Sequence, residues 1–480
     1  MARRKEARQT QSDRVMADIA DYVLSGKILC KLAHKTARYC MMDAIGCGLE
    51  ALSYPACTKL LGPVVPEAVM PGGARVPGTA WELDPVSAAF NISAMNRWLD
   101  FNDAFMAASG AHPSDNLGGI LATADYLSRR NVRQRKKPLL MRDVLTAMIK
   151  AHEIQGVLSL ENDFIALGLD NVILVKIATT AVVAGLLGGS RDEIINALSH
   201  AWLDGHPLRT YRIKPTLGSR KSWAAADASS RGVRLALIAL TGEMGYPTAL
   251  SAEKWGFCDT LFRGKPLIVA RPYGSYVMEN VNFKIAIPSG IHGQTAAECA
   301  FALHPLVKNR LDEVHRVYMW THQSAQHLIT ANVPLRNPAA RDHSLQYISA
   351  IGLIFGRLLA SDYEDEIAAD LRVDALRAKM TVEVDEVYTR RFRDPAQRAN
   401  PYGMQIEFKD GTRSAKVEVL YPLGHPQRRK EGMPLLVAKF RKNLARTFSH
   451  KRRQEILALC NDQALLEKTP VNEFVALFAF

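Results

Sequence analysis

The chain has 480 residues, of which 48% are hydrophobic and 23% charged, the ordinary balance of a folded protein with a large core. This length predicts two or three domains. The formal charge is +13, yet no RNA-binding signature or zinc-finger spacing accompanies basic runs such as RRNVRQRKK (129–137). We therefore expect an anionic substrate and no nucleic-acid partner.

The seven cysteines form no C-x-x-C pair, and their number is odd. This pattern favours a reducing compartment and argues against a disulfide framework or a thiolate zinc site. It also argues against an iron–sulfur cluster, whose cysteines are usually closely spaced. The cysteines therefore predict no thiolate-bound metal site.

The first residues, MARRKEARQTQSDR, lack the apolar core of a secretory signal. Their arginines leave a mitochondrial address open, although Glu6 and Asp13 argue against it. The longest apolar segment, 171–189, contains Lys176 and is typical of a buried helix rather than a membrane span. We expect a cytoplasmic protein with no membrane partner.

Helical periodicity dominates residues 14–255, where apolar residues recur at three- and four-residue spacing between Gly and Pro punctuation. GCGLEA (46–51) matches a dinucleotide-binding pattern but follows a predicted helix, so close helix packing is the better interpretation. HEIQG (152–156) lacks the second histidine of a zinc motif, so His152 is expected to be a satisfied core residue. The predicted helices span 15–46, 86–106, 116–130, 141–160, 191–205 and 230–245.

Strand signals appear next, at 312–322 and 380–388 and as a hairpin at 404–422 that turns at Asp410-Gly411. Helical patterns lie between them and return after Pro434. The fold class is therefore mainly α with α+β. We expect a large all-helical domain from both chain ends (1–279 and 433–480) and an inserted smaller α+β lid domain (280–432).

Ionisable and apolar residues are mixed in RWLDFNDAFMAASGAHPSDN (97–116). Asp100 and Asp103 lie three apart and would share a helix face. His112 precedes a predicted helix start, where the helix dipole disfavours imidazolium and a neutral imidazole can act as a general base. The alternative is that the aspartates form ordinary salt bridges with Arg97 and that Asp115 only caps the helix.

A second cluster, RTYRIKPTLGSRKSW (209–223), holds five cations and no acid, which suits a substrate with several carboxylates. The alternative is a solvated basic loop. Lys284 and His292 lie where the helical unit gives way to the α+β unit, at an expected cleft, or else at a structural hinge. The five cations are Arg209, Arg212, Lys214, Arg220 and Lys221.

One chemistry uses all of these parts, namely loss of water from a β-hydroxy polycarboxylate. It needs a base for a carbon-bound proton beside a carboxylate, an acid for the departing hydroxyl, and cations for the developing charge. Enzymes of the aconitase type take a Lewis acid from an iron–sulfur cluster, for which this chain has no cysteine set. Lysines, arginines and an acid–histidine group would have to replace it.

Long motifs connect the chain to a known family: CGLEAL, YPACTKLLGP, WLDFND, HPSDNLGGILATADYLSR, RKSWAAADASSR, RPYGSYVMENV and RDHSLQY. Over about residues 14–478 the chain resembles the MmgE/PrpD family. The resemblance implies a homodimer that needs no cofactor and removes water from a 2-alkylcitrate, a tricarboxylate. It also implies the helical domain with an inserted lid. The implied catalytic residues are Asp100, His112, Asp170, Lys221 and Lys284.

Two departures from the family pattern concern the alkyl group of the substrate. Ala104 and Phe105 replace a usual Thr-Trp pair, and the residues before His112 are small, so a longer chain than methyl could fit, as in a maleidride-type secondary pathway. One alternative is neutral drift in a 2-methylcitrate enzyme. A second is a cis-aconitate-type decarboxylase, whose pocket tyrosine has no clear counterpart in 321–338. A third is a basic, catalytically silent scaffold or nucleic-acid binder. The expected substrate-binding residues are Arg212, Arg220, Asn116, His292, Ala104, Phe105, Ser109 and Gly110.

Overall fold

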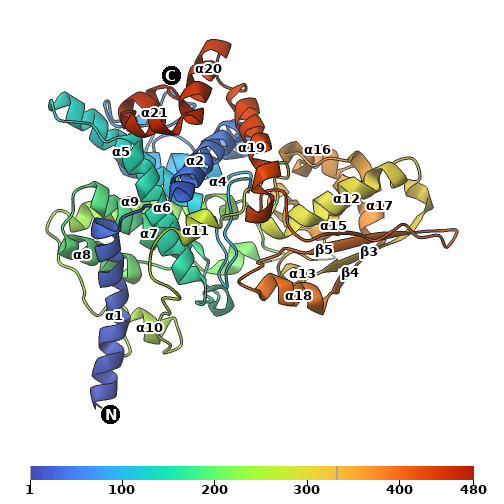
Figure 1. Cartoon of the computed structure of the whole chain (residues 1–480), viewed down its shortest axis with the longest axis horizontal. Coiled ribbons are helices and arrows are strands. Elements are labelled where there is room, and N and C mark those ends of the chain that lie inside the picture. The colour runs from blue at the N-terminus through green and yellow to red at the C-terminus, as the bar shows by residue number, and fades with distance from the viewer. Residues whose placement is uncertain (1, 214, 331–332) are drawn as a thin grey trace.

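The computed structural model describes residues 2–213, 215–330 and 333–480 (Figure 1). The first part of the chain is helical, as predicted, apart from the short strands β1 (Ala74–Arg75) and β2 (Glu82–Leu83). Its helices are α1 (Ala2–Ser25), α2 (Lys31–Ala51), α3 (Pro55–Thr58), α4 (Pro85–Arg97), α5 (Leu117–Arg133), α6 (Met141–Ser159), α7 (Val172–Leu186), α8 (Arg191–Leu203), α9 (Arg220–Ala239), α10 (Phe257–Thr260) and α11 (Tyr276–Glu279).

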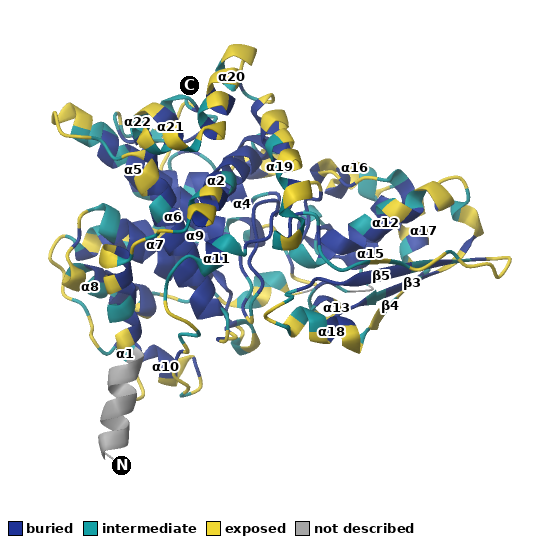
Figure 2. Ribbon diagram, in the orientation of Figure 1, coloured by how far each residue is buried: buried dark blue, intermediate teal, exposed yellow. Residues whose placement is uncertain are grey.

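Both ends of the chain contribute to the larger hydrophobic core, which runs from Val15 to Ile285 and again from Leu436 to Phe478. Figure 1 shows the C-terminal helices beside α2 and α5, and Figure 2 shows the buried residues concentrated on α2, α6, α7 and α9. The C-terminal segment thus belongs to the core that the N-terminal helices begin. Its helices are α19 (Arg429–Leu444), α20 (His450–Asn461), α21 (Gln463–Lys468) and α22 (Val471–Ala476).

A second core, from Ile287 to Phe408, surrounds a four-stranded sheet of order β4-β3-β5-β6. Strand β3 (Val314–Thr321) pairs in parallel with β4 (Met380–Val384) and antiparallel with β5 (Tyr402–Phe408), which pairs antiparallel with β6 (Val417–Val419). The surrounding helices are α12 (Gln294–Val307), α13 (Gln323–Ile329), α14 (Pro338–Arg341), α15 (Leu345–Phe355), α16 (Asp365–Ala368), α17 (Leu371–Arg377) and α18 (Glu386–Arg393).

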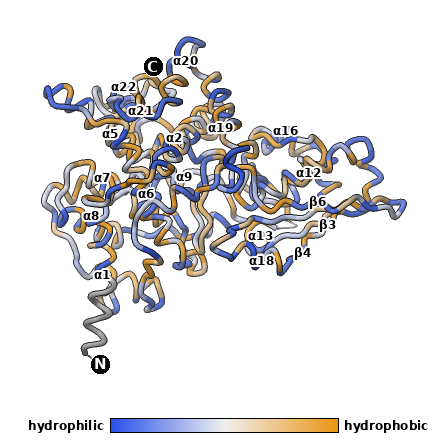
Figure 3. The backbone as a smooth tube through the Cα atoms, in the orientation of Figure 1, coloured by the Kyte–Doolittle hydropathy of each residue, from blue (hydrophilic) through white to orange (hydrophobic). Residues whose placement is uncertain are grey.

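The sheet is covered on both faces, by α12 and α15 on one side and by α13 and α18 on the other (Figure 1). The loop after β5 contains Asp410 and Gly411, as the hairpin signal predicts, and forms the hydrophilic tip at the far right of Figure 3. The described structure is therefore mainly α with a smaller α+β part, which confirms the predicted fold class. The exact domain boundaries stay predictions.

Four predicted elements are too long. The helix expected over 15–46 is two helices, since α1 ends at Ser25 and α2 begins at Lys31, and the helix expected over 230–245 ends with α9 at Ala239. The helix expected over 86–106 ends at Arg97, because Asp100 adopts a left-handed φ of 49° that a helix does not allow. The strand expected over 380–388 ends at Val384, because the Asp385 side chain accepts hydrogen bonds from the backbone of Val387 and Tyr388 and starts α18.

Close helix packing explains the glycines of GCGLEA. A Cβ at Gly46 would lie 3.1 Å from the Phe440 ring, and one at Gly48 would lie 2.7 Å from Oδ1 of Asn96. Both glycines lie inside α2, which confirms the packing interpretation. Segment 171–189 forms the buried helix α7, and among the described residues no helix is long and apolar enough to cross a membrane.

Gly118 allows α5 to lie against α4, so its replacement tests the packing that positions the segment around His112. A Cβ there would lie 2.6 Å from the carbonyl oxygen of Ala89 and 2.7 Å from the amide nitrogen of Ser93, and backbone cannot easily move away. We expect Gly118→Ala to lower the free energy of unfolding by about 1–3 kcal/mol, measured by urea denaturation. Gly205→Ala, where no atom lies within 4 Å, is the control, and equal stability of the two variants would contradict the packing argument.

Candidate active site

A cavity lies between the helical part and the inserted α+β part of the chain. One wall comes from the loop that follows α4 and from the short 3-10 helix Arg209–Arg212. The other comes from Gly290–His292, α13, α18 and His343, which lies two residues after the end of α14. The polar side chains that line the cavity are Arg97, Asp100, His112, Asn171, Arg209, Arg212, His292, Ser324 and His343.

Asp100 stands at the centre of the polar wall and is 1% exposed. Its Oδ1 lies 2.6 Å from Nη1 of Arg97 and accepts a hydrogen bond from Nζ of Lys284, which also donates to the Asp100 carbonyl at 2.8 Å. Its Oδ2 lies 3.5 Å from Nζ of Lys221. Burial raises the pKa of Asp100, but these three cations outweigh burial and hold the pKa well below its usual value. The carboxylate is therefore ionised and a weak base.

His112 presents a neutral imidazole to this carboxylate. Its Nδ1 lies 2.7 Å from the carbonyl oxygen of Asp103, which can only accept, so Nδ1 carries the proton. The unprotonated Nε2 lies 3.6 Å from Oδ1 of Asp100. Burial, together with Arg97 and Lys284, lowers the pKa of His112 well below 6.5. The imidazole is therefore neutral, as predicted, and burial and neighbouring cations keep it neutral more than the helix start does; its role as a base stays a prediction.

His343 is a second histidine at the cavity, and sequence reasoning missed it. Its Nδ1 lies 2.6 Å from Oδ1 of Asp342 and 3.2 Å from Nζ of Lys221, and its Nε2 lies 3.6 Å from Oδ2 of Asp100. Burial and the charge of Lys221 lower its pKa. The adjacent acid and histidine in RDHSLQY were the only sequence signal, and that signal alone does not place them beside residues more than a hundred positions away.

The two predicted lysines lie behind the polar wall rather than in it. Lys221 and Lys284 are at most 1% exposed and are paired with protein carboxylates, since Nζ of Lys221 lies 2.7 Å from Oδ2 of Asp342. Neither lines the cavity. Burial lowers the pKa of Lys284 to about 8, against the opposing effect of Asp100. The expectation that these lysines hold substrate carboxylates is therefore corrected, because their first partners are Asp100 and Asp342.

Two arginines of the basic loop do reach the cavity. Nε of Arg212 donates to Oδ2 of Asp170, and Nη1 of Arg209 lies 3.5 Å from the same oxygen. Burial raises the pKa of Asp170, but Arg212 and Arg209 outweigh it and lower the pKa. Asp170 is fully buried and does not line the cavity, so its geometry is that of a carboxylate that orients the arginines. Lys214, predicted in the same loop, lies outside the described residues.

Three predicted binding residues are not at the cavity. Arg220 is partly exposed, pairs with Asp227 at 3.5 Å and stacks on Trp223. The amide of Asn116 bonds inside the protein to Gln155 and Thr179. These two residues, like Ser109, do not line the cavity.

Ser109 is buried, and its hydroxyl accepts a hydrogen bond from the amide nitrogen of Phe164 at 2.8 Å. Gly110, next to Ser109 in sequence, does line the cavity. Three further predicted binding residues also line it: Ala104, Phe105 and His292. Burial lowers the pKa of His292 to about 4, so its ring is neutral.

Asp103 does not share a face with Asp100, as the predicted helix required. Its Oδ2 lies 3.0 Å from Nε2 of His152, whose Nδ1 lies 2.8 Å from the Met148 carbonyl oxygen. His152 is therefore a satisfied core histidine, as predicted. In the described part of the chain all seven cysteines are free thiols.

Two groups of side chains bring three possible metal ligands within 4.8 Å of one another: Cys40, Asp103 and His152, and Asp100, Asp342 and His343. In the first group Asp103 is already hydrogen-bonded to His152. In the second, the Lys221 ammonium stands between the two carboxylates, and Arg97 and Lys284 add two more positive charges. A dication there would have to displace or oppose these cations, so the donor set fits an ammonium better.

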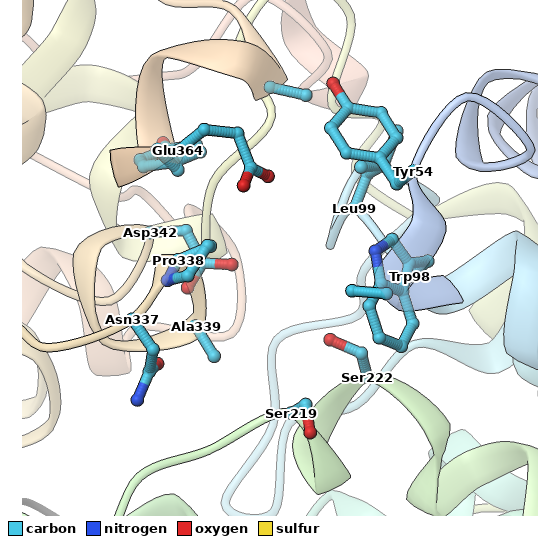
Figure 4. Close-up of a pocket in the computed structure, with 13 residues that line it drawn as sticks. Tyr54, Trp98, Leu99, Ser219, Ser222, Asn337, Pro338, Ala339, Asp342 and Glu364 are labelled. Atoms are coloured by element: carbon cyan, nitrogen blue, oxygen red, sulfur yellow. The ribbon is translucent and has the colours of Figure 1, made fainter. Parts of the chain in front are cut away.

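Asp342 also lines a second cavity between the two parts of the chain (Figure 4). Figure 4 shows Tyr54 and Trp98 on one wall and Glu364 and Pro338 facing them. No histidine or arginine lines this second cavity among the described residues. The first cavity, with its histidines and arginines, is therefore the candidate active site.

Removing the charge of Asp100 should destabilise the fold as well as the site. Asp100→Asn leaves three buried cations without their common partner, so we expect the free energy of unfolding to fall by about 3–5 kcal/mol. Because the folded pKa is depressed, this contribution is complete above the ordinary value of 3.8 and is lost only as the pH falls below it. Thermal unfolding of both proteins across pH measures the difference. A variant as stable as the parent at neutral pH would contradict the electrostatic account.

Comparison with known proteins agrees with this architecture. The MmgE/PrpD N-terminal domain matches residues 17–269 and the MmgE/PrpD C-terminal domain matches residues 287–463. The chain is 57% identical to the 2-methylcitrate dehydratase of Cupriavidus necator over 98% of each chain, and 56% identical to that of Escherichia coli (strain K12) over 97% of each. It is 41% identical to the 2-methylcitrate dehydratase-like protein oryR of Aspergillus oryzae, over 97% of this chain and 95% of that one. This chain belongs to the MmgE/PrpD family.

Proposed function

We propose that this protein is a hydro-lyase that removes water from 2-methylcitrate and forms the corresponding cis-methylaconitate. The observation that carries the proposal is the cavity in which two neutral histidines face one ionised, cation-bound carboxylate, with two arginines on the same wall. This is the set of groups that dehydration of a hydroxy-tricarboxylate requires. The identity of 56–57% to proteins named 2-methylcitrate dehydratase supports the choice of substrate.

His112 takes the carbon-bound proton in this proposal. Its Nε2 is unprotonated, lines the cavity and lies 3.6 Å from Oδ1 of Asp100. Asp100 is the poorer base, because its three cations hold its pKa far down. When Nε2 receives the proton, the imidazolium that forms is next to an ionised carboxylate, which stabilises it. Asp100 therefore orients His112 and balances its charge.

The departing hydroxyl takes a proton from Nε2 of His343, and the Lys221 ammonium supplies a proton to Nδ1, so the imidazole stays neutral. His343 lines the cavity, and its Nδ1 contacts both the Asp342 carboxylate and the Lys221 ammonium. In the whole step a C–H bond and a C–O bond break, a C=C bond forms, and the hydroxyl leaves as water. The proton held by His112 then returns to solvent, and Lys221 takes a proton back from solvent, so both groups regain their starting state. Arg209 and Arg212, oriented by Asp170, bind substrate carboxylates and stabilise the charge that develops on them.

The alkyl group of the substrate would lie against the apolar side of the cavity, which includes Ala104, Phe105, Ile291, Leu328 and Phe392. The identity of 56–57% to proteins named 2-methylcitrate dehydratase favours methyl over a longer chain. The family resemblance also supports a homodimer, which light scattering of the purified protein would test.

Turnover of a substrate series tests the proposal. We expect purified protein to convert 2-methylcitrate, followed by absorbance of the new double bond, with higher kcat/KM than citrate or ethyl- and propylcitrate. Rising kcat/KM with chain length, by about 0.8 kcal/mol for each buried methylene, would instead establish a longer alkylcitrate as the substrate. Release of CO₂ from cis-aconitate without hydration or dehydration would establish the decarboxylase and contradict the proposal.

Substitution of the two histidines should separate their roles. We expect His112→Asn to lower kcat by about 10²–10⁴-fold, because the base that takes the carbon-bound proton is lost. The same variant should stop exchange of that proton with deuterated solvent, whereas His343→Asn should slow water loss and keep the exchange. His206→Asn, a half-buried histidine outside the cavity, is the control. Full turnover in His112→Asn would remove its assigned role.

The pH profile of kcat/KM should be limited by Lys284 on the alkaline side. Its ammonium balances Asp100 and is lost as the pH rises through about 8, so activity should fall with that apparent pKa. The base must be neutral, and because the pKa of His112 lies well below 6.5, activity should persist as the pH falls through 6.5. Initial rates in overlapping buffers measure both limbs. An acid limb at 6.5 would contradict the assigned environment of His112.

A further inference from the structure

Lys439, on the C-terminal helix α19, is a buried charge that lies outside the cavity. Its side chain is 7% exposed, and its Nζ donates to Oδ1 of Asp43, to the carbonyl of Phe101 and to the carbonyl of Lys284, each at 2.8 Å. The ammonium also lies 3.4 Å from the centre of the Phe101 ring. An ammonium has three hydrogens, so all of its donors are in use.

Two of these three acceptors adjoin the central ion pair of the candidate active site. Phe101 directly follows Asp100, and Lys284 is the residue whose Nζ donates to the Asp100 carboxylate and carbonyl. Lys439 therefore donates a hydrogen bond to the main chain beside each member of the Asp100–Lys284 pair. Phe101 and Lys284 are far apart in sequence. Neither residue belongs to a helix or a strand that would fix its carbonyl group.

A second cation of α19 holds the same segment. Nη2 of Arg429 donates to the carbonyl of Val281 at 2.7 Å, and its guanidinium lies 4.8 Å from the centre of the Phe283 ring. Residues 281–284, which connect the helical part to the inserted part, are thus fixed from the C-terminal helix at two points.

We propose that Lys439 is a positioning residue for the dehydration reaction, which holds the backbones of Phe101 and Lys284 so that Lys284 meets the Asp100 carboxylate. This inference rests on the proposed function. The alternative is a purely structural role, in which Lys439 only neutralises the buried Asp43. The two roles differ in what happens when Asp43 no longer needs a partner.

Three variants separate these roles. Asp43→Asn should keep kcat near that of the parent, because Lys439 still holds both carbonyls. Lys439→Met should lose both stability and turnover, since it strands the buried Asp43 carboxylate. The double variant Asp43→Asn with Lys439→Met removes the stranded charge and should recover stability over the single Met variant, yet kcat should stay about 10²-fold below the parent. Recovery of parental kcat in the double variant would overturn the proposal.

The pH profile is a readout that a structural role would not move. The double variant removes one positive and one negative charge, so the net local charge is unchanged. If Lys284 moves away from Asp100, however, it loses the negative charge that raises its pKa. We therefore expect the alkaline limb of kcat/KM to shift to lower pH in the double variant, and by more than in Asp43→Asn, which removes only the attraction between Asp43 and Lys284. An alkaline limb that stays in place in the double variant would overturn the proposal.

Phe440→Leu, a substitution in the buried core of the same helix beside Gly46, is the control for lost stability. It should lower the melting temperature and leave kcat and the pH profile unchanged, and a loss of kcat equal to that of Lys439→Met would overturn the proposal. If the Met variants do not fold, Lys439→Gln removes the charge and has a side chain one atom too short to hold both carbonyls, and parental kcat in it would overturn the proposal equally. A parent that does not turn over 2-methylcitrate would refute the proposed function, whereas active parent and active double variant would refute only the role of Lys439.

Discussion

The structure depends on one buried carboxylate and the cations that surround it. Moving an ionised carboxyl group out of water costs far more than any single hydrogen bond returns, so a buried aspartate must be surrounded by positive charge or be protonated. Asp100 is surrounded: Arg97 comes from the end of α4, Lys221 from the first turn of α9 and Lys284 from the segment after α11. His343 approaches from the inserted part. The requirement to balance this one charge brings four separate segments together where the two parts of the chain meet.

The same electrostatics produces the chemistry. Cations that keep Asp100 ionised also keep the nearby histidines neutral, because they oppose a further positive charge on either ring. A neutral imidazole beside an ionised carboxylate can take up a proton, and the carboxylate then balances the new charge. The lysines support this arrangement from behind, whereas the arginines of the cavity wall remain available to an anionic substrate. The division differs from the expectation that all basic residues of the site would bind substrate directly.

The C-terminal helices connect the fold to the site. Leu436 and Phe440 extend the core that the N-terminal helices begin, and on the same helix Lys439 holds the backbone beside Asp100 and Lys284. The inserted part contributes Asp342 and His343. Because both parts supply groups to one ion-pair network, a change in their separation would alter the surroundings of Asp100 at once.

The sequence by itself determined the class of fold, the all-helical first part, the hairpin after β5, the return of the C-terminal helices, and the presence of Asp100 and His112 at a polar site. Those features follow from local periodicity, turn chemistry and the long family motifs, which are written within short stretches of chain. Only the tertiary structure decided that the helix ends at Arg97, that Asp103 turns to His152, that Arg220, Asn116 and Ser109 lie away from the cavity, and that His343 lies in it. The reason is physical: where a charged side chain points depends on which opposite charge reaches it, and for Asp100 those partners lie as far away in sequence as Lys284 and His343.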